Sequence, residues 1–494
     1  MSAVSQSKMM KTLAIVLAFG LTASAAPYDK SGIADWTKAP GPTAEPTFVP
    51  PVAKRMRLAN GMALLVIENH ALPIVSMRLV VPNAGSATDP KGKPGVAAFT
   101  ADLLDEGAAG LTAIQIAEEQ DKLGASIGVF AGIDQAGVSV STLTKTLDPT
   151  IDLVAKIVTQ PTFDAKDFER VKGDRATGLE LRRDRPREVV SVMFGSMLYG
   201  LDSPYGHPGS GFRESFKSIA LAELQQFYKD RWDPKHMTLV VAGDVDAISL
   251  HKKLDATLGA WNHAGKSAGS IATTPIAKPA HRLVLVDRPG AQQSDVRIGL
   301  VGLERKDPKF YAFEVLTTTL GGGFTSRLNQ KLREGLGITY GISAGQDWRL
   351  ARGPFGISSA IVTAETAHGL TETLKIVDDF AATDIPDAEL EKSKQNLIRA
   401  LPAQFGTNAA TAGAFAELAL HGLPDSWYAR YADSIRKVTA KDVRAVAKST
   451  IPSSKMVFAV VGDMAKVRTD LEKLGLGEPE LRDNYGVPIL TTNK

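Results

Sequence analysis

The apolar residues of the chain follow two spacings, one typical of strands and one typical of helices. Residues 55–69 hold apolar runs on either side of Asn60-Gly61, which predicts a β-hairpin. Residues 73–85 are a further strand candidate. The segment 94–107, PGVAAFTADLLDEG, instead repeats its apolar residues every three or four positions between two breakers, and therefore predicts a helix.

One face of this predicted helix has an unusual composition. Ala98, Ala101, Asp102 and Asp105 share it, because positions three, four and seven apart lie together on a helix. With Glu106 next in sequence, the carboxylates could bind a hard cation or act as an acid/base pair. A solvated helix end is the alternative, and we favour it.

The chain also contains an internal repeat. Segments 150–174 and 369–396 each predict a helix, a turn and a second helix, and segments 230–246 and 449–465 each predict a helix, a loop and a strand. The matched residues keep nearly one offset along the chain: Phe163 and Ile385, Phe168 and Leu390, Lys172 and Lys394, Gly243 and Gly462, Asp244 and Asp463.

The repeat predicts an α+β fold of two homologous α/β domains in tandem, each a mostly antiparallel sheet packed with helices, in a clamshell-like arrangement. We place the domains at 56–262 and 283–494. A linker at 263–282 is rich in Gly, Ala, Ser and Pro, and residues 26–55 form an extended Pro-rich lead-in.

Residues 1–25 have the layout of a secretory signal peptide. Lys8 and Lys11 precede an apolar run from Leu13 to Leu21, and Ala23-Ser24-Ala25 supplies small residues for cleavage. A buried N-terminal helix is the alternative interpretation. The run is too short for a permanent membrane anchor, so we expect a periplasmic protein.

Composition excludes several classes of function. The 494 residues carry a formal charge of only +3, which does not favour nucleic-acid binding. Without cysteine there is no disulfide, thiolate ligand or Cys nucleophile. No two of the eight histidines lie closer in sequence than His251 and His263, so no local zinc motif exists. The glycine-rich LGGGFTSRL lacks the lysine of a phosphate loop.

Several motifs together resemble the pitrilysin/insulinase family of zinc peptidases. They are the two-domain repeat, the strand at 73–86, the Gly-x-Ala-x-Phe helix that follows it, and SPYGHPGSG at 203–211. The resemblance covers nearly the whole mature chain. It is strongest to bacterial members of about this length, which are related to the mitochondrial processing peptidases.

The resemblance also implies that the metal site is missing. In active members the helix carries His-x-x-Glu-His, and those three places fall on Ala98, Ala101 and Asp102. The family's third ligand, a Glu on a later helix, falls at Gly178, and Glu180 points elsewhere on that helix. We therefore expect no metal and no catalytic residue in this chain.

The second half departs less from the family. Segment 320–345 predicts a glycine-rich loop, a helix from about Thr325 to Glu334, a turn and a strand. The resemblance gives Arg333 and Tyr340 the role of holding substrate peptide, and both side chains can donate to a peptide carbonyl or oxyanion. Alternatively, Arg333 only complements a helix C-terminus and Tyr340 packs in a strand.

Three hypotheses of function remain. The first is the metal-free, substrate-binding subunit of a heterodimeric zinc endopeptidase, with zinc held by a homologous partner. The second is a structural or peptide-binding protein without peptidase activity, as in family members that are core subunits of respiratory complexes. The third, an autonomous metallopeptidase using Asp102 and distant ligands, is disfavoured by the lost motif.

Overall fold

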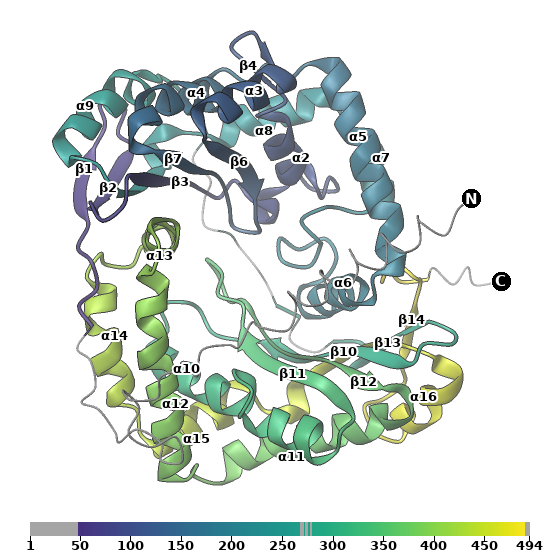
Figure 1. Ribbon diagram of the computed structural model, residues 1–494. Helices are drawn as coiled ribbons and strands as arrows, with labels where there is room; N and C mark the ends of the chain where they lie inside the picture. The colour runs from purple at the N-terminus through teal and green to yellow at the C-terminus, as the bar shows by residue number, and fades with distance from the viewer. Residues whose placement is uncertain (1–47, 267–270, 272–274, 277–278, 490–494) are drawn as a thin grey trace, which may run out of the picture. The chain divides into compact units, whose positions relative to one another are not determined.

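The chain is built around two six-stranded sheets, as a computed structural model shows (Figure 1). The structure describes residues 48–266, 271, 275–276 and 279–489. The predicted signal peptide and most of the lead-in lie outside these residues, as does part of the linker. Both sheets are mostly antiparallel and packed with helices, so the expected fold class is confirmed.

The first sheet is formed by the first half of the chain. Its spatial order is β1 (Lys54–Arg57), β2 (Ala63–Glu68), β8 (Thr238–Gly243), β3 (Ile74–Pro82), β7 (Gln135–Leu143) and β6 (Ser126–Ala131). Strands β1 and β2 are the predicted hairpin, and Gly61 in its turn has φ of 92°, which favours glycine. Only β2 and β8 pair in parallel in this sheet.

The second sheet repeats this plan in the second half. Its order is β11 (Thr339–Gln346), β12 (Pro354–Val362), β10 (Gln293–Val301), β13 (Val457–Gly462), β9 (Leu283–Asp287) and β14 (Glu480–Arg482). The separation in sequence between β3 and β10 equals the separation between β7 and β12. The repeat inferred from the sequence is thus present as two equivalent sheets with different edge strands.

Helix pairs accompany each sheet at the predicted places. Helices α4 (Leu147–Thr159) and α5 (Ala165–Glu180) belong to the first half, and α11 (Thr366–Ala382) and α12 (Asp387–Ala400) to the second. The side chain of Asp164 caps α5 by accepting from the backbone N–H groups of Lys166 and Asp167. Both predicted helix-turn-helix segments are therefore confirmed.

The two halves exchange one helix each. Helix α6 (Pro186–Tyr199) packs on β10 and β13 of the second sheet, whereas α13 (Asn408–Leu420) packs on β3 and β8 of the first (Figure 1). The separation in sequence between α6 and α13 equals the separation between α5 and α12. The two exchanged helices are therefore equivalent members of the internal repeat. Each sheet therefore completes its burial with a helix from the other half.

Apolar burial holds α6 in place. Val190, Met193 and Phe194 of α6 share one buried cluster with β-strand residues of the second half, including Val286 and Val461. A fully buried side chain of this size contributes roughly 1.5–3 kcal/mol. This cluster joins the two halves through their cores.

Shorter helices complete the fold. They are α2 (Val96–Leu103), α3 (Ala113–Leu123), α7 (Arg213–Lys217), α8 (Leu221–Arg231), α9 (Ala247–Ala256), α10 (Phe310–Gly321), α14 (Trp427–Arg436), α15 (Ala440–Thr450) and α16 (Met464–Glu472), with a small ribbon of β4 (Gly107–Ala108) and β5 (Leu111–Thr112). No helix within the described residues has the length and apolar character needed to cross a membrane.

Candidate functional site

Helix α2 carries three of the four positions where the family's metal motif would stand. It ends at Leu103, so the predicted helix over 94–107 is too long and Asp105 lies beyond its end. Phe99 fixes the helix by stacking on Phe168 of α5, with ring centroids 5.1 Å apart. Ala98 and Ala101 offer only methyl groups, so neither can donate to a metal.

Asp102 is occupied by an ion pair. Its Oδ2 lies 2.5 Å from Nε of Arg175 on α5, and the arginine also lies over the ring of Phe99, 5.8 Å from its centroid. Gly178, one turn further along α5, has no side chain, and a Cβ built there would meet nothing within 4 Å. The structure thus brings α2 and α5 together as the family's site requires, but an arginine stands beside the one carboxylate. These residues do not fit a zinc ion.

Asp105 and Glu106, the acidic residues that follow α2, are half-buried. Burial raises the pKa of Asp105 to about 6, and the nearby carboxylates of Glu106 and Asp102 add to this shift. Glu106 pairs with Arg170 of α5. Within the described residues no group of three or more His, Asp or Glu side chains lies together as a metal site would require.

The second-half segment has a different geometry. The chain is helical from Arg327, and Asn329–Gly335 forms a π-helical turn, η6, rather than the α-helix predicted from Thr325. π-Helical turns are rare in proteins, and those that occur frequently lie at functional sites. Asn329 ties η6 to β11, because its side chain donates to the carbonyl of Ile342 over 2.7 Å and accepts from the Ile342 N–H over 3.1 Å.

The structure brings Arg333 and Tyr340 together. The guanidinium of Arg333 lies 3.8 Å from the ring centroid of Phe324 and 5.1 Å from that of Tyr340. Its Nε is 3.4 Å from the carboxylate of Glu334. Tyr340 is 86% exposed and Phe324 60%, so Tyr340 does not pack in the sheet as the alternative interpretation required. The two aromatic rings orient the arginine, whose side chain remains 25% exposed.

This pair borders a pocket of about 630 Å³ above β11, β12 and β10. Serines 343, 358 and 359 and Gly341 belong to its lining, so its strand side offers small and polar groups. Helix α6 contributes Arg187, Val190 and Ser191. The pocket thus has walls from both halves, because of the exchanged helix.

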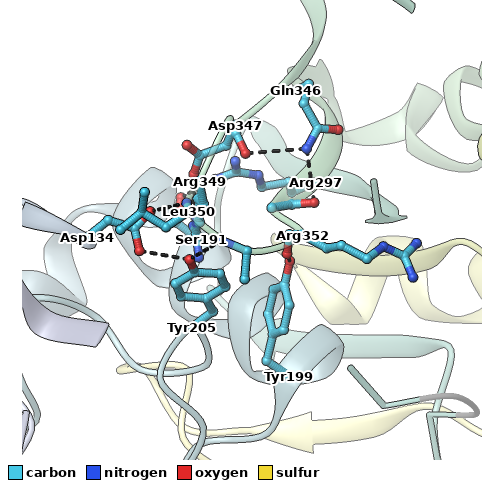
Figure 2. Close-up of polar contacts among 12 residues, drawn as sticks. Asp134, Ser191, Tyr199, Tyr205, Arg297, Gln346, Asp347, Arg349, Leu350 and Arg352 are labelled. Atoms are coloured by element: carbon cyan, nitrogen blue, oxygen red, sulfur yellow. Dashed lines mark hydrogen bonds and ion pairs between the residues drawn. The ribbon is translucent and has the colours of Figure 1, made fainter. Parts of the chain in front are cut away.

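Three charged pocket residues, Arg187, Asp295 and Arg297, were missed by the sequence analysis. Arg297 of β10 donates from Nη1 to the hydroxyl of Ser191 over 3.0 Å and lies 4.9 Å from the ring centroid of Phe194 (Figure 2). Asp295 lies 3.6 Å from Nε of Arg187, and its own burial raises its pKa. A signal did exist, because Arg78 stands at the position of β3 that matches Arg297 of β10 in the repeat.

Comparison with known proteins supports the class that this fold defines. The model of the insulinase family, peptidase family M16, matches residues 64–198, and the model of the peptidase M16 inactive domain matches residues 218–397. An uncharacterised zinc protease of Mycobacterium tuberculosis is 26% identical over 423 residues, which cover 84% of this chain and 94% of that protein. A Helicobacter pylori protein described as a non-peptidase homologue is 23% identical over 408 residues, 81% of this chain and 91% of that protein.

Solved structures show the same architecture. The peptidase M16 inactive domain from Pseudomonas fluorescens superposes with a TM-score of 0.74 and 27% identity, covering 83% of this chain and 98% of that one. A chain of complex III2 from Candida albicans superposes with a TM-score of 0.70 at 15% identity, covering 85% and 99%. The two-sheet fold is thus that of M16-type peptidases. The chain belongs to the insulinase/pitrilysin-type family, as a member that lacks the metal motif.

Proposed function

We propose that this chain is the metal-free, substrate-binding subunit of a heterodimeric zinc metalloendopeptidase that cleaves peptides in the periplasm. A homologous partner subunit would hold the zinc. Arg333 and Tyr340 of this chain would bind the peptide near that metal. No step of hydrolysis is assigned to the residues of α2, because none of them can polarise a carbonyl or activate water.

The exposed Tyr340 beside the half-buried Arg333 is the observation that carries this proposal. A structural arginine and tyrosine would bury their polar groups against their own fold, whereas Tyr340 is 86% exposed beside a pocket. The Arg333 guanidinium and the Tyr340 hydroxyl are donors suited to a peptide carbonyl or to a developing oxyanion. The pair therefore needs a second molecule to complete a catalytic centre.

Family relationships support a paired arrangement without identifying the partner. Complex III2 from Candida albicans is an assembly that contains a chain of the same fold. The same finding, with the Helicobacter pylori non-peptidase homologue, favours the second candidate function. In that case the chain is a structural or peptide-binding homologue without any role in proteolysis.

Reconstitution distinguishes the two functions. The chain would be purified alone and after co-expression with a homologue from the same genome that has an intact His-x-x-Glu-His helix. We expect peptide cleavage and zinc only in the complex. Cleavage by the isolated chain with one bound zinc would overturn the proposal. A stable homodimer that never associates with such a homologue would favour the structural function.

The site of action is a separate proposal. It rests on the signal-peptide layout of residues 1–25, and cell fractionation with an antibody against the chain would test it. Recovery of the mature chain in the periplasmic fraction is expected. Recovery of an unprocessed chain in the cytoplasm would contradict it.

A further inference from the structure

Arg297 occupies a repeated position whose environment differs between the two sheets. Arg78 is the fifth residue of β3 and pairs in register with Ser139, and Arg297 is the fifth residue of β10 and pairs with Ser358. Both arginines stack on an aromatic ring, at 4.2 Å from the Phe130 centroid for Arg78 and 4.9 Å from the Phe194 centroid for Arg297. Arg78 therefore serves as an internal reference for the charged neighbours of Arg297.

The first sheet places a carboxylate where its charge acts on the arginine, although the two do not form an ion pair. Glu417, on the exchanged helix α13, interacts electrostatically with Arg78, and this interaction helps to lower the pKa of the carboxyl group after the larger effect of His421. Glu417 is the tenth residue of α13, and the tenth residue of α6 is Gly195. Helix α6 thus presents no carboxylate at the equivalent place.

The guanidinium of Arg297 is left without an ion pair among the described residues. It donates to Ser191, while its buried Nε has no partner there. The acid whose charge acts on it, Asp347, is bound by Arg349 at 2.8 and 3.0 Å, and Arg349 itself adds positive charge (Figure 2). A half-buried cation without a counter-ion is unfavourable, so this geometry favours an anion that arrives from outside.

The pocket gives such an anion access. Arg297 lines the same pocket as Arg333, and the charged lining residues are three arginines and one aspartate, Asp295, which is engaged by Arg187. Register places Arg297 level with Ser343 of β11, through Ser358 of β12. Ser343 lies three positions after Tyr340, or roughly 10 Å along the strand. One extended peptide can therefore reach both groups.

We infer that this pocket is a carboxylate subsite and that Arg297 is its specificity-determining residue. The inference rests on the proposed function, because the ligand is the peptide that Arg333 and Tyr340 hold. The carboxylate comes from an acidic side chain a few residues from that point or from the peptide's C-terminus. A charge-assisted pair with Arg297 would then supply the counter-ion that the described residues do not provide.

Binding to the isolated full chain tests this inference. The probes are fluorescein-labelled ten-residue Ala/Ser peptides with one Glu, matched peptides with Gln at that position, and versions with a free or amidated C-terminus. Fluorescence anisotropy gives each Kd. We expect one class of carboxylate to improve binding roughly ten- to a hundredfold over its neutral counterpart. The Glu/Gln comparison tests an acidic side chain as the carboxylate, and the comparison of free with amidated C-termini tests the C-terminal carboxylate.

Variants distinguish the subsite from a structural role. Arg297→Gln should bind charged and neutral peptides equally, whereas Arg297→Lys should keep part of the preference. Arg78→Gln, the matched change in the first sheet, should leave the preference intact. Thermal unfolding of each variant checks that it folds. A preference that survives Arg297→Gln overturns the inference.

The outcomes also separate the inference from the proposed function. If charged and neutral peptides bind equally well, and Arg333→Ala weakens both, the carboxylate subsite is wrong and the substrate-binding function stands. If no peptide binds the chain, alone or with its partner, both fall.

Discussion

The metal-motif helix of the first half and the η6–β11 segment of the second half show two outcomes on one repeated scaffold. Helix α2 keeps its packing, with Phe99 against Phe168 and Phe216, while its site face holds methyl groups and an ion-paired aspartate. The η6–β11 segment keeps both its packing, through Asn329, and a half-buried arginine beside an exposed tyrosine. This difference shows that the side chains that pack an element into the core can be kept while those on its opposite face change. A fold can therefore persist where the residues for catalysis are absent.

The largest effect is expected from a change that separates the two halves. Phe194→Ala removes a side chain that is 1% exposed and packs in the α6 cluster of the second sheet. It should destabilise the chain by about 3–5 kcal/mol, because a cavity remains. Urea unfolding should show one transition that shifts as a whole, since each half contains a helix of the other.

Phe324→Ala is the matched control, because the same substitution is made at a side chain that is 60% exposed. It should leave unfolding unchanged. Two separate transitions in the Phe194→Ala protein, with only one of them shifted, would show that the halves are independent.

The next largest effect is expected on peptide cleavage by the proposed heterodimer, when the site residues of the two halves are changed in turn. Arg333→Ala should reduce kcat/KM for peptide cleavage by roughly 10²–10³, about 2.7–4 kcal/mol, as expected for loss of one oxyanion-type donor. Tyr340→Phe should act in the same direction. Asp102→Ala, in the first half, should leave the rate unchanged.

Gel filtration should show the same dimer for all three variants, since none of these side chains belongs to a buried core. Equal loss of activity in Asp102→Ala and Arg333→Ala would contradict the assignment of substrate binding to the second half alone.

The smallest effect concerns the acid that follows α2. Burial raises the pKa of Asp105 to about 6, so between pH 4 and 6 the folded chain keeps a proton that the unfolded chain has lost. The contribution of Asp105 to the free energy of unfolding should therefore fall as the pH rises through this window and then level off. Asp105→Asn should remove that dependence and stabilise the chain by roughly 1–2 kcal/mol at pH 7.5, with little change at pH 4.

Thermal unfolding over pH 4–8 measures this. Asp470→Asn is a control on an exposed carboxylate of the second half and should not alter the profile. A difference in stability between wild type and Asp105→Asn that stays constant across this window would show that Asp105 is ionised in the folded state.

Local features of the fold could be predicted from the sequence, because short-range rules determine them. The Asn60-Gly61 hairpin and both helix pairs follow from turn residues and apolar spacing. The exchange of α6 and α13 could not be predicted, since an apolar helix face shows that it is buried but not against which sheet. The order of the strands is missing from the sequence for the same reason.

The site was partly predictable. Arg333 and Tyr340 were identified through the family resemblance, and the structure places them together. The π-helical turn has no sequence signature, so the helix was placed from Thr325 and given ordinary geometry. Arg297 was missed because a single arginine in an apolar strand indicates nothing until its repeat partner, Arg78, is aligned with it.

The exchanged helices have a consequence for how the chain matures. During synthesis, the first sheet is complete by Gly243, but the helix that covers it, Asn408–Leu420, is made only after β9, β10, β11 and β12 of the second sheet. Helix α6 is made early and has no sheet to cover until β10 and β13 follow. Neither half can therefore reach its native state as a separate, earlier product. A chain of this kind finishes folding only once nearly all of it has been synthesised.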